Sequence, residues 1–162
     1  MSDIETLREQ IKDIQIAMLT TVDEDGSLRS RPMGTLDAEK FDGDLWFFTS
    51  ASEPKVDEVR RDHQVNVSYA DAGSNNYVSV SGVASIVHDR AKMKELWNPI
   101  MKAWFPEGLE TPDIALMRIK VTKAEYWDYA SSKLVQLVGF VKAVVTGEEA
   151  NDLGKNEKLT IR

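Results

Sequence analysis

Short alternating or aromatic-rich stretches are separated along the chain by stretches in which apolar residues recur every three or four positions. Alternation is typical of strands with one buried face, and the longer spacing is typical of helices that pack one side on a core. The first kind of stretch predicts strands at residues 16–22, 28–36, 45–50, 64–70, 77–87 and 114–130. The second kind predicts helices at residues 2–15, 52–62, 89–105 and 131–147.

Turn and capping residues support these limits. Ser2 and Glu5 have the spacing of a capping box, and Asp89 can cap the third helix. Pro99 is expected to kink that helix, because proline lacks an amide hydrogen and clashes with the preceding turn. Gly82 lies in mid-strand, where a bulge or bend is expected. The turn segments DEDGS and DAGSNN each join two strands into a hairpin.

The order of elements favours a mainly β fold with flanking helices. Hairpins with helices inserted between them do not alternate as βαβ units would, so an antiparallel sheet or barrel is expected rather than a doubly wound sheet. Residues 1–147 are predicted to form a single domain, which suits a chain of 162 residues. Residues 148–162 are charged and aperiodic, and we expect them to form a frayed tail.

Composition narrows the classes of function. Twenty Lys and Arg against 27 Asp and Glu give a net charge of −7, which disfavours nucleic acid and anionic membrane surfaces as partners. The chain has no cysteine, and its histidines, His63 and His88, lack the spacing of metal ligands, so no metal site is expected. Neither a signal peptide nor an apolar run long enough for a membrane span is present. We expect a cytoplasmic protein.

Two arginines on one strand form the first candidate site. A strand alternates its faces, so Arg29, Arg31 and Met33 point one way while Ser30 and Pro32 point the other. Adjacent guanidinium groups repel each other unless an anion joins them, and they can grip a phosphate or carboxylate in bidentate fashion. The arginines therefore either bind an external anion or pair with acidic residues of the chain.

The segment that joins the third strand to the second helix is the second candidate. Thr49 and Ser50 supply hydroxyl groups at a strand end, and Lys55 lies in the first turn of a helix whose amides can bind an anion. These are the parts of a phosphate cradle, although capping of the helix and a solvated lysine explain them equally well. No glycine-rich nucleotide-binding motif is present.

Aromatic residues precede this cradle and recur on two later strands. Phe48 comes just before it, Tyr77 begins a strand, and Trp127 lies near the end of the long one. Such residues most often pack in a core, but a planar cofactor also needs flat apolar walls.

The ordered set of motifs resembles a known family over almost the whole chain, from Ile4 to Gly147. It consists of IAMLTTVDEDGSLRSRPM, LWFFTSASEPKVDEVRRDHQVNVSYAD, YVSVSGVASIV, WFPEGLETPDIALMRIKVTKAEYWD and GFVKAVVTG. Together these segments resemble the general stress protein branch of the pyridoxamine 5′-phosphate oxidase-like, FMN-binding split barrels. The resemblance implies a six-stranded antiparallel split β-barrel that dimerises, with two FMN sites at the interface of the homodimer.

The resemblance also implies roles for individual residues. Arg31 or Arg29 matches the arginine directed at the FMN phosphate, on the strand that runs beside the isoalloxazine ring. Lys55 matches the lysine that closes the phosphate site, and Trp127 matches a tryptophan presented by the second subunit. The full predicted set of cofactor-binding residues is Arg29, Ser30, Arg31, Pro32, Met33, Phe48, Thr49, Ser50, Lys55, Tyr77 and Trp127.

Departures from the oxidases limit the reaction that can be expected. Glu53 and Pro54 stand where the oxidases carry an arginine, and Tyr77 stands where they carry a flavin-contacting glutamine. An apolar helix containing Lys133 replaces their basic substrate-binding segment, so the sequence argues against pyridoxamine phosphate oxidase activity.

Two classes of function follow from the resemblance. The first is an FMN-dependent oxidoreductase that acts on a small substrate or takes electrons from a reduced nicotinamide, and it needs no catalytic side chain from the protein. The second is a non-catalytic carrier or sensor of FMN or FAD. A split barrel that binds haem or a deazaflavin, and a nucleic-acid-binding barrel, are further alternatives.

Overall fold

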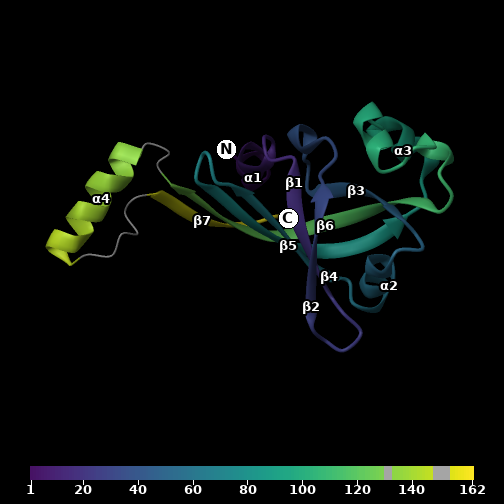
Figure 1. Ribbon diagram of the computed structural model, residues 1–162, viewed down its shortest axis with the longest axis horizontal. Coiled ribbons are helices and arrows are strands. Elements are labelled where there is room, and N and C mark those ends of the chain that lie inside the picture. The colour runs from purple at the N-terminus through teal and green to yellow at the C-terminus, as the bar shows by residue number, and fades with distance from the viewer. Residues whose placement is uncertain (130–132, 148–153) are drawn as a thin grey trace.

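The computed structural model describes residues 1–129, 133–147 and 154–162, with residues 133–139 described by their backbone. A curved antiparallel sheet forms its body, and helices lie around the sheet (Figure 1). The helices are α1 (Asp3–Ile11), α2 (Pro54–Arg61), α3 (Arg90–Leu96) and α4 (Lys133–Thr146), with short 3₁₀ helices η1 (Ala38–Lys40), η2 (Pro99–Ala103) and η3 (Gly108–Glu110). The strands are β1 (Ile16–Val22), β2 (Leu28–Gly34), β3 (Asp44–Ser50), β4 (Gln64–Asp71), β5 (Asn76–Val87), β6 (Ile114–Tyr129) and β7 (Gly154–Thr160).

Six strands follow the order β2-β1-β4-β5-β6-β3, and every pairing is antiparallel. The curled sheet with flanking helices confirms the predicted split barrel. Its interior is filled by inward-facing residues of these strands together with Leu7 and Ile11 of α1. A second apolar cluster, around Phe48 and Leu116, lies beneath α3.

The prediction of a frayed tail is wrong for Gly154–Thr160. These residues form β7, which pairs with β6 from Lys123 to Tyr129. β3 pairs with the same strand from Ile114 to Lys120, so β3 and β7 follow one another along β6. Leu159 of β7 is buried in the barrel core, which explains why the strand forms in a polar segment.

Several predicted limits are confirmed, and two change. The capping box of Ser2 and Glu5 is present, and Asp89 caps α3 by accepting a hydrogen bond from Lys92 N. At Pro99 the helix breaks instead of kinking, because α3 ends at Leu96 and η2 begins at the proline.

The bulge expected in the fifth strand is present between Ser81 and Gly82. A Cβ atom at Gly82 would lie 2.5 Å from the carbonyl oxygen of Lys120, so only glycine fits there. The second changed limit is that of α2, which begins at Pro54 with Glu53 as its N-cap, two residues after the predicted start at residue 52.

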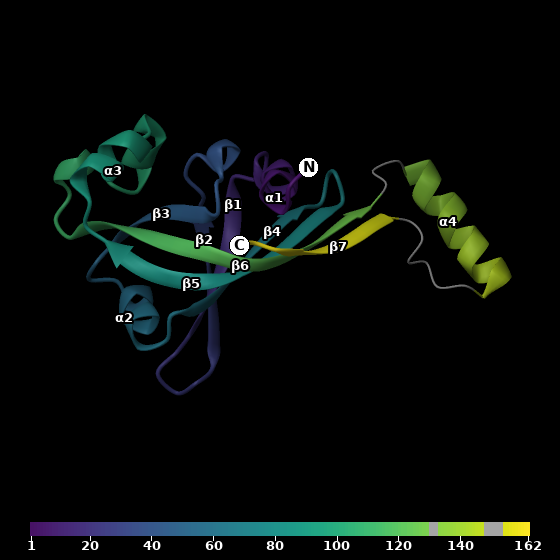
Figure 2. The same cartoon turned by 180° about the vertical axis from the view of Figure 1, so that it is seen from behind.

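Different elements lie near the two ends of β6. α2 and α3 lie near one end, and α4 and β7 lie near the other, as two opposite views agree (Figures 1 and 2). Within the described ranges, no helix has the length and apolarity needed to cross a membrane.

Candidate functional site

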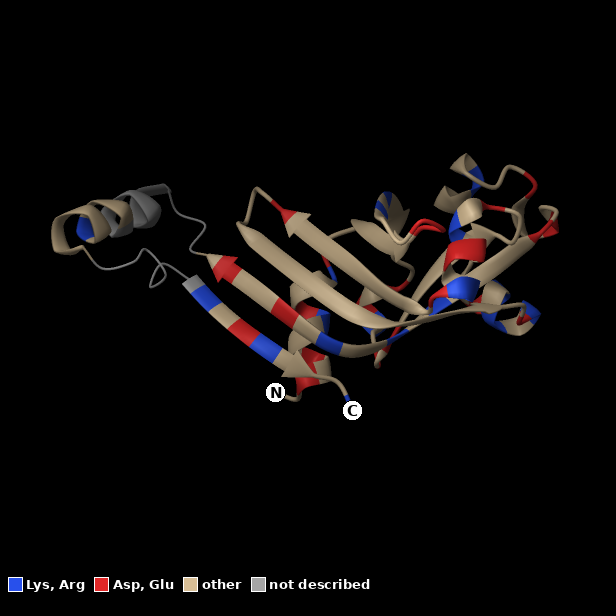
Figure 3. Ribbon diagram, turned by 90° about the horizontal axis from the view of Figure 1, so that it is seen from below, with Lys and Arg blue, Asp and Glu red and all other residues tan. Residues whose placement is uncertain are grey.

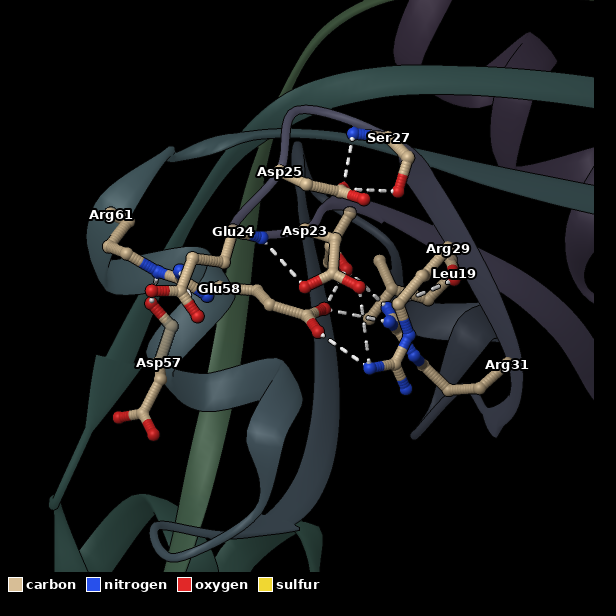
Figure 4. Close-up of polar contacts among 11 residues, drawn as sticks. Leu19, Asp23, Glu24, Asp25, Ser27, Arg29, Arg31, Asp57, Glu58 and Arg61 are labelled. Carbon is tan, nitrogen blue, oxygen red and sulfur yellow. Dashed lines mark hydrogen bonds and ion pairs between the residues drawn. The ribbon is translucent and has the colours of Figure 1, made fainter.

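The two arginines of β2 converge on one buried carboxylate, that of Glu58 in α2 (Figure 4). Arg29 Nη1 lies 3.1 Å from Glu58 Oε1, and Arg31 Nη2 donates a hydrogen bond of 2.9 Å to Glu58 Oε2. Thr21 donates to the same Oε2 atom and accepts a 2.7 Å hydrogen bond from Arg31 Nη1. The chain therefore supplies an anion of its own between the arginines.

Exposure distinguishes the three charged groups. The Glu58 side chain is 1% exposed, Arg31 is 16% exposed and Arg29 is 49% exposed. Burial lowers the pKa of Arg31, and the charge of Glu58 opposes that shift. Pairing with an acidic residue, one of the two alternatives left open by the sequence, is thus present in the structure. The main partner is Glu58, while Asp23 of the DEDG turn lies 3.8 Å from Arg29. Binding of an external anion by the arginines stays a prediction.

The other residues of β2 follow the predicted alternation. Met33 is buried in the barrel, on the arginine side of the strand. Ser30 and Pro32 are exposed on the opposite side, where Ser30 Oγ lies 2.6 Å from the hydroxyl of Thr20.

A cavity of about 250 Å³ lies between β2, the end of β3, α2 and the η2 region. One wall is apolar and aromatic, because Phe48, Met101, Trp104 and Phe105 line it. The other residues that line it are Pro32, Met33, Gly34, Glu53 and Lys55. The structure therefore brings four predicted residues, Pro32, Met33, Phe48 and Lys55, to one hollow.

Lys55 provides the positive charge of this cavity. Its side chain is 13% exposed, and Nζ lies 2.6 Å from Glu53 Oε2. Glu53 is 41% exposed, so it can turn toward solvent and release the lysine, whereas Glu58 is enclosed. The positive end of the α2 dipole lies at the same place, because Pro54 begins the helix. A compact anion at this end of the cavity would meet both.

Thr49 and Ser50 end β3 beside the cavity but do not line it. Thr49 is fully buried, and its hydroxyl donates a 3.5 Å hydrogen bond to the carbonyl oxygen of Ser50. Ser50 Oγ lies 2.9 Å from Ser52 Oγ, and Ser50 N donates to Glu53 Oε1. In this structure both hydroxyls stabilise the turn into α2, and their binding of a phosphate stays a prediction.

Tyr77 and Trp127 do not line the cavity, and they lie at the other end of β6 from Thr49 and Ser50. They pair with each other across β5 and β6, whereas Ser50 pairs with Ile114 at the opposite end of β6. Ile114 and Trp127 are thirteen positions apart on β6, which corresponds to about 40 Å along the strand. Within one chain, Trp127 and the Thr49–Ser50 end of β3 therefore lie at opposite ends of β6.

Sequence reasoning missed Glu58 and the aromatic wall formed by Trp104 and Phe105. The only signal for Glu58 was its position beside Val59 on the buried side of a helix, which is weak. The apolar residues after Pro99 were visible, but they were attributed to a kinked helix and not to a cavity wall. Both histidines are exposed, and the described residues contain no cluster of acids and histidines that could hold a metal.

The sequence of this chain is similar to a known protein family and to a known protein. Residues 2–151 match the model of the family described as pyridoxamine 5′-phosphate oxidase like. Protein bli-3 of Neurospora crassa is 32% identical over 145 residues, which cover 84% of this chain and 69% of that protein.

Solved structures agree with that match. A candidate general stress protein 26 from Jannaschia sp. CCS1 superposes with a TM-score of 0.75 over 97% of each chain, at 23% identity. The general stress FMN/FAD binding protein of Xanthomonas citri gives a TM-score of 0.68 at 30% identity, over 80% of this chain and 90% of that one.

Proposed function

Because this chain belongs to the pyridoxamine 5′-phosphate oxidase-like family, we propose that it is an FMN-binding protein that acts as a flavin-dependent oxidoreductase on a small substrate. FAD is the alternative cofactor, and the relative from Xanthomonas citri is described as binding FMN/FAD. The observation that carries the proposal is the cavity, which combines an aromatic wall with a lysine at a helix N-terminus.

The lining residues suit the two ends of FMN. The isoalloxazine ring is planar and largely apolar, and Phe48, Trp104 and Phe105 offer an apolar surface of matching character. The phosphate is a compact dianion, and Lys55 can bind it by a charge-assisted hydrogen bond once Glu53 turns away.

The cavity volume of about 250 Å³ accommodates part of such a ligand and leaves the rest for a second subunit to cover. We propose that a homodimer supplies that cover, with Tyr77 and Trp127 of the second subunit completing each site. This arrangement explains how residues at opposite ends of β6 can serve one cofactor. A bound flavin would supply electron and hydride transfer. The chain's own residues would hold the phosphate, orient the ring and leave one face open to a small substrate or a reduced nicotinamide.

A titration with FMN and with riboflavin tests the proposal, because the two ligands differ only in the phosphate. We expect Lys55→Ala to weaken FMN binding about tenfold to a hundredfold, since a charged hydrogen bond contributes about 1.5–3 kcal/mol. Riboflavin binding should stay unchanged in this variant. Flavin fluorescence at constant ionic strength measures both affinities.

Lys40→Ala is the matched control, because Lys40 is exposed and pairs with Asp37 away from α2. This variant should bind FMN as the wild type does. If Lys55→Ala also binds FMN as tightly as the wild type, the phosphate does not lie at Lys55.

A flavin carrier or sensor without turnover is the second candidate function. It is favoured by the cavity lining, because among the described residues that line it Glu53 and Lys55 alone are charged and neither histidine is present. Stopped-flow mixing of the FMN-loaded protein with NADH or NADPH separates the two functions. Fast and saturable bleaching of the flavin bands supports the oxidoreductase, and its absence with both donors supports the carrier.

A further inference from the structure

Helix α4 carries an apolar stripe that the rest of the chain leaves uncovered. Phe140 is 61% exposed, Val141 51%, Val144 68% and Val145 79%. Their spacing puts all four on one side of the helix. The helix has no acidic residue, and it stands apart from the sheet in both views of the fold (Figures 1 and 2). In the charge-coloured view, its described part is almost free of charge (Figure 3).

A second uncovered apolar surface lies at the other end of the molecule. Ile100 of η2 is 69% exposed and Trp104, just after η2, is 63% exposed. Trp104 also lines the candidate flavin cavity, together with Met101. The exposed surface of η2 is therefore the outer side of the same wall that faces the ligand.

The exposed area of the chain matches that of a subunit taken out of a dimer. The chain exposes 9566 Å², whereas a compact monomer of 18.2 kDa is expected to expose about 8100 Å². The excess, about 1500 Å², exceeds the roughly 800 Å² that each partner buries in a stable complex of standard size. A second copy of this chain is thus the occupant that the area favours over a short peptide.

Two-fold symmetry can pair the two surfaces. In a two-fold dimer, if a residue of one copy contacts a given residue of the other, the reverse contact also exists. Two apolar surfaces at opposite ends of an elongated chain can then cover each other twice in one closed dimer. The same arrangement brings the Trp127 end of β6, which precedes α4 in the chain, toward the partner's cavity.

We infer that α4 of each subunit packs its Phe140–Val145 stripe on Ile100 and Trp104 of the partner subunit, and so covers the partner's flavin cavity. This inference deepens the proposed function, since it adds a helix of the second subunit to the site. The packing would exclude water from the aromatic end of the cavity and hold Trp104 in place.

Cysteine cross-linking tests the contact directly, because the natural chain has no cysteine. The variant Ile100→Cys/Val144→Cys is treated with a short bismaleimide in the absence of flavin and run on a denaturing gel. We expect a covalent dimer as the main product. The single variants Ile100→Cys and Val144→Cys should stay monomeric on the gel, because in the inferred dimer each of these positions faces the other one and not its own copy.

The variant Leu28→Cys/Val144→Cys is the matched control, since Leu28 is 72% exposed on the first hairpin and outside the inferred contact. It should give no covalent dimer. A cross-link within one chain would show that α4 folds back on its own η2, and it would overturn the inference. If Ile100→Cys/Val144→Cys and a second pair across the inferred contact, Trp104→Cys/Phe140→Cys, both give only monomers, the inference is also overturned.

Flavin binding gives an independent second measurement. Replacing Phe140 and Val144 by serine should weaken FMN and riboflavin by the same factor, at least tenfold, because the cover acts on the ring end. Lys55→Ala weakens FMN alone, so the two effects are separable. Cross-linked dimers that bind no flavin would overturn the proposed function and leave the α4 contact standing. Flavin affinity that is equal in the serine variant and the wild type would overturn the covering role.

Discussion

At the scale of single residues, the charge cluster of Glu58 shows how far the sequence could be interpreted. Two arginines of like orientation on one strand require an anion, and this much could be predicted from the alternation of β2. The identity of that anion could not, because Glu58 lies 27 residues after Arg31 and reaches it only once α2 packs on the barrel. Long-range pairing of this kind leaves no local pattern in a sequence.

Removal of the Glu58 carboxylate should destabilise the fold. Glu58→Ala leaves Arg31 largely buried beside Arg29 without a counterion, and breaking a buried pair in this way costs about 3–5 kcal/mol. The partial exposure of the arginines places the expected loss near the lower limit, at about 3 kcal/mol. Urea unfolding of the flavin-free protein measures it. Asp57→Ala is the control, because Asp57 is exposed and its ion pair with Arg60 is long, at 4.0 Å. This variant should change stability by less than about 0.5 kcal/mol.

A double variant separates charge from packing. Glu58→Leu/Arg31→Met removes both partners of the main ion pair, so it should be more stable than Glu58→Ala. Equal losses in the two variants would mean that the side-chain volumes, and not the ion pair, stabilise this part of the barrel.

At the scale of elements, the spacing of apolar residues was sufficient to predict the strands and helices that bury a clear apolar face. β4 and β5 alternate strictly, and their hairpin was predicted with nearly the observed limits. β7 was missed because a single residue, Leu159, faces the core, while Lys155 and Lys158 are exposed. Charged side chains are a common feature of strands at a sheet edge, where they discourage pairing with other chains.

The contribution of β7 can be measured through its one core residue. Leu159→Ala should lower the free energy of unfolding by about 2–4 kcal/mol, because a buried leucine loses its packing and leaves a cavity. Lys158→Ala, next to it on the exposed side, should change stability little. Denaturant unfolding followed by tryptophan fluorescence compares the two. Similar small effects in both variants would show that β7 adds little to the stability of the barrel.

At the scale of the whole molecule, the resemblance of ordered motifs gave the split barrel, and the family match agrees with it. The sequence also placed Pro32, Met33, Phe48 and Lys55 in one site, and the cavity brings these residues together. It could not show that Tyr77 and Trp127 lie outside that cavity, because their position follows from the register of β6 with β3 and β5. A site divided in this way joins cofactor binding to assembly.

Coupling between flavin and the dimer follows from thermodynamic linkage. If each cavity is completed by the second subunit, FMN binds the dimer more tightly than the monomer, and saturating FMN must strengthen dimerisation in turn. We expect the dimer dissociation constant to fall at least tenfold, as measured by sedimentation equilibrium over a dilution series. Lys55→Ala at the same FMN concentration should show a smaller fall, because it keeps the interface and loses phosphate binding. A dissociation constant that does not change while FMN binds one-to-one would show that each site lies within a single subunit.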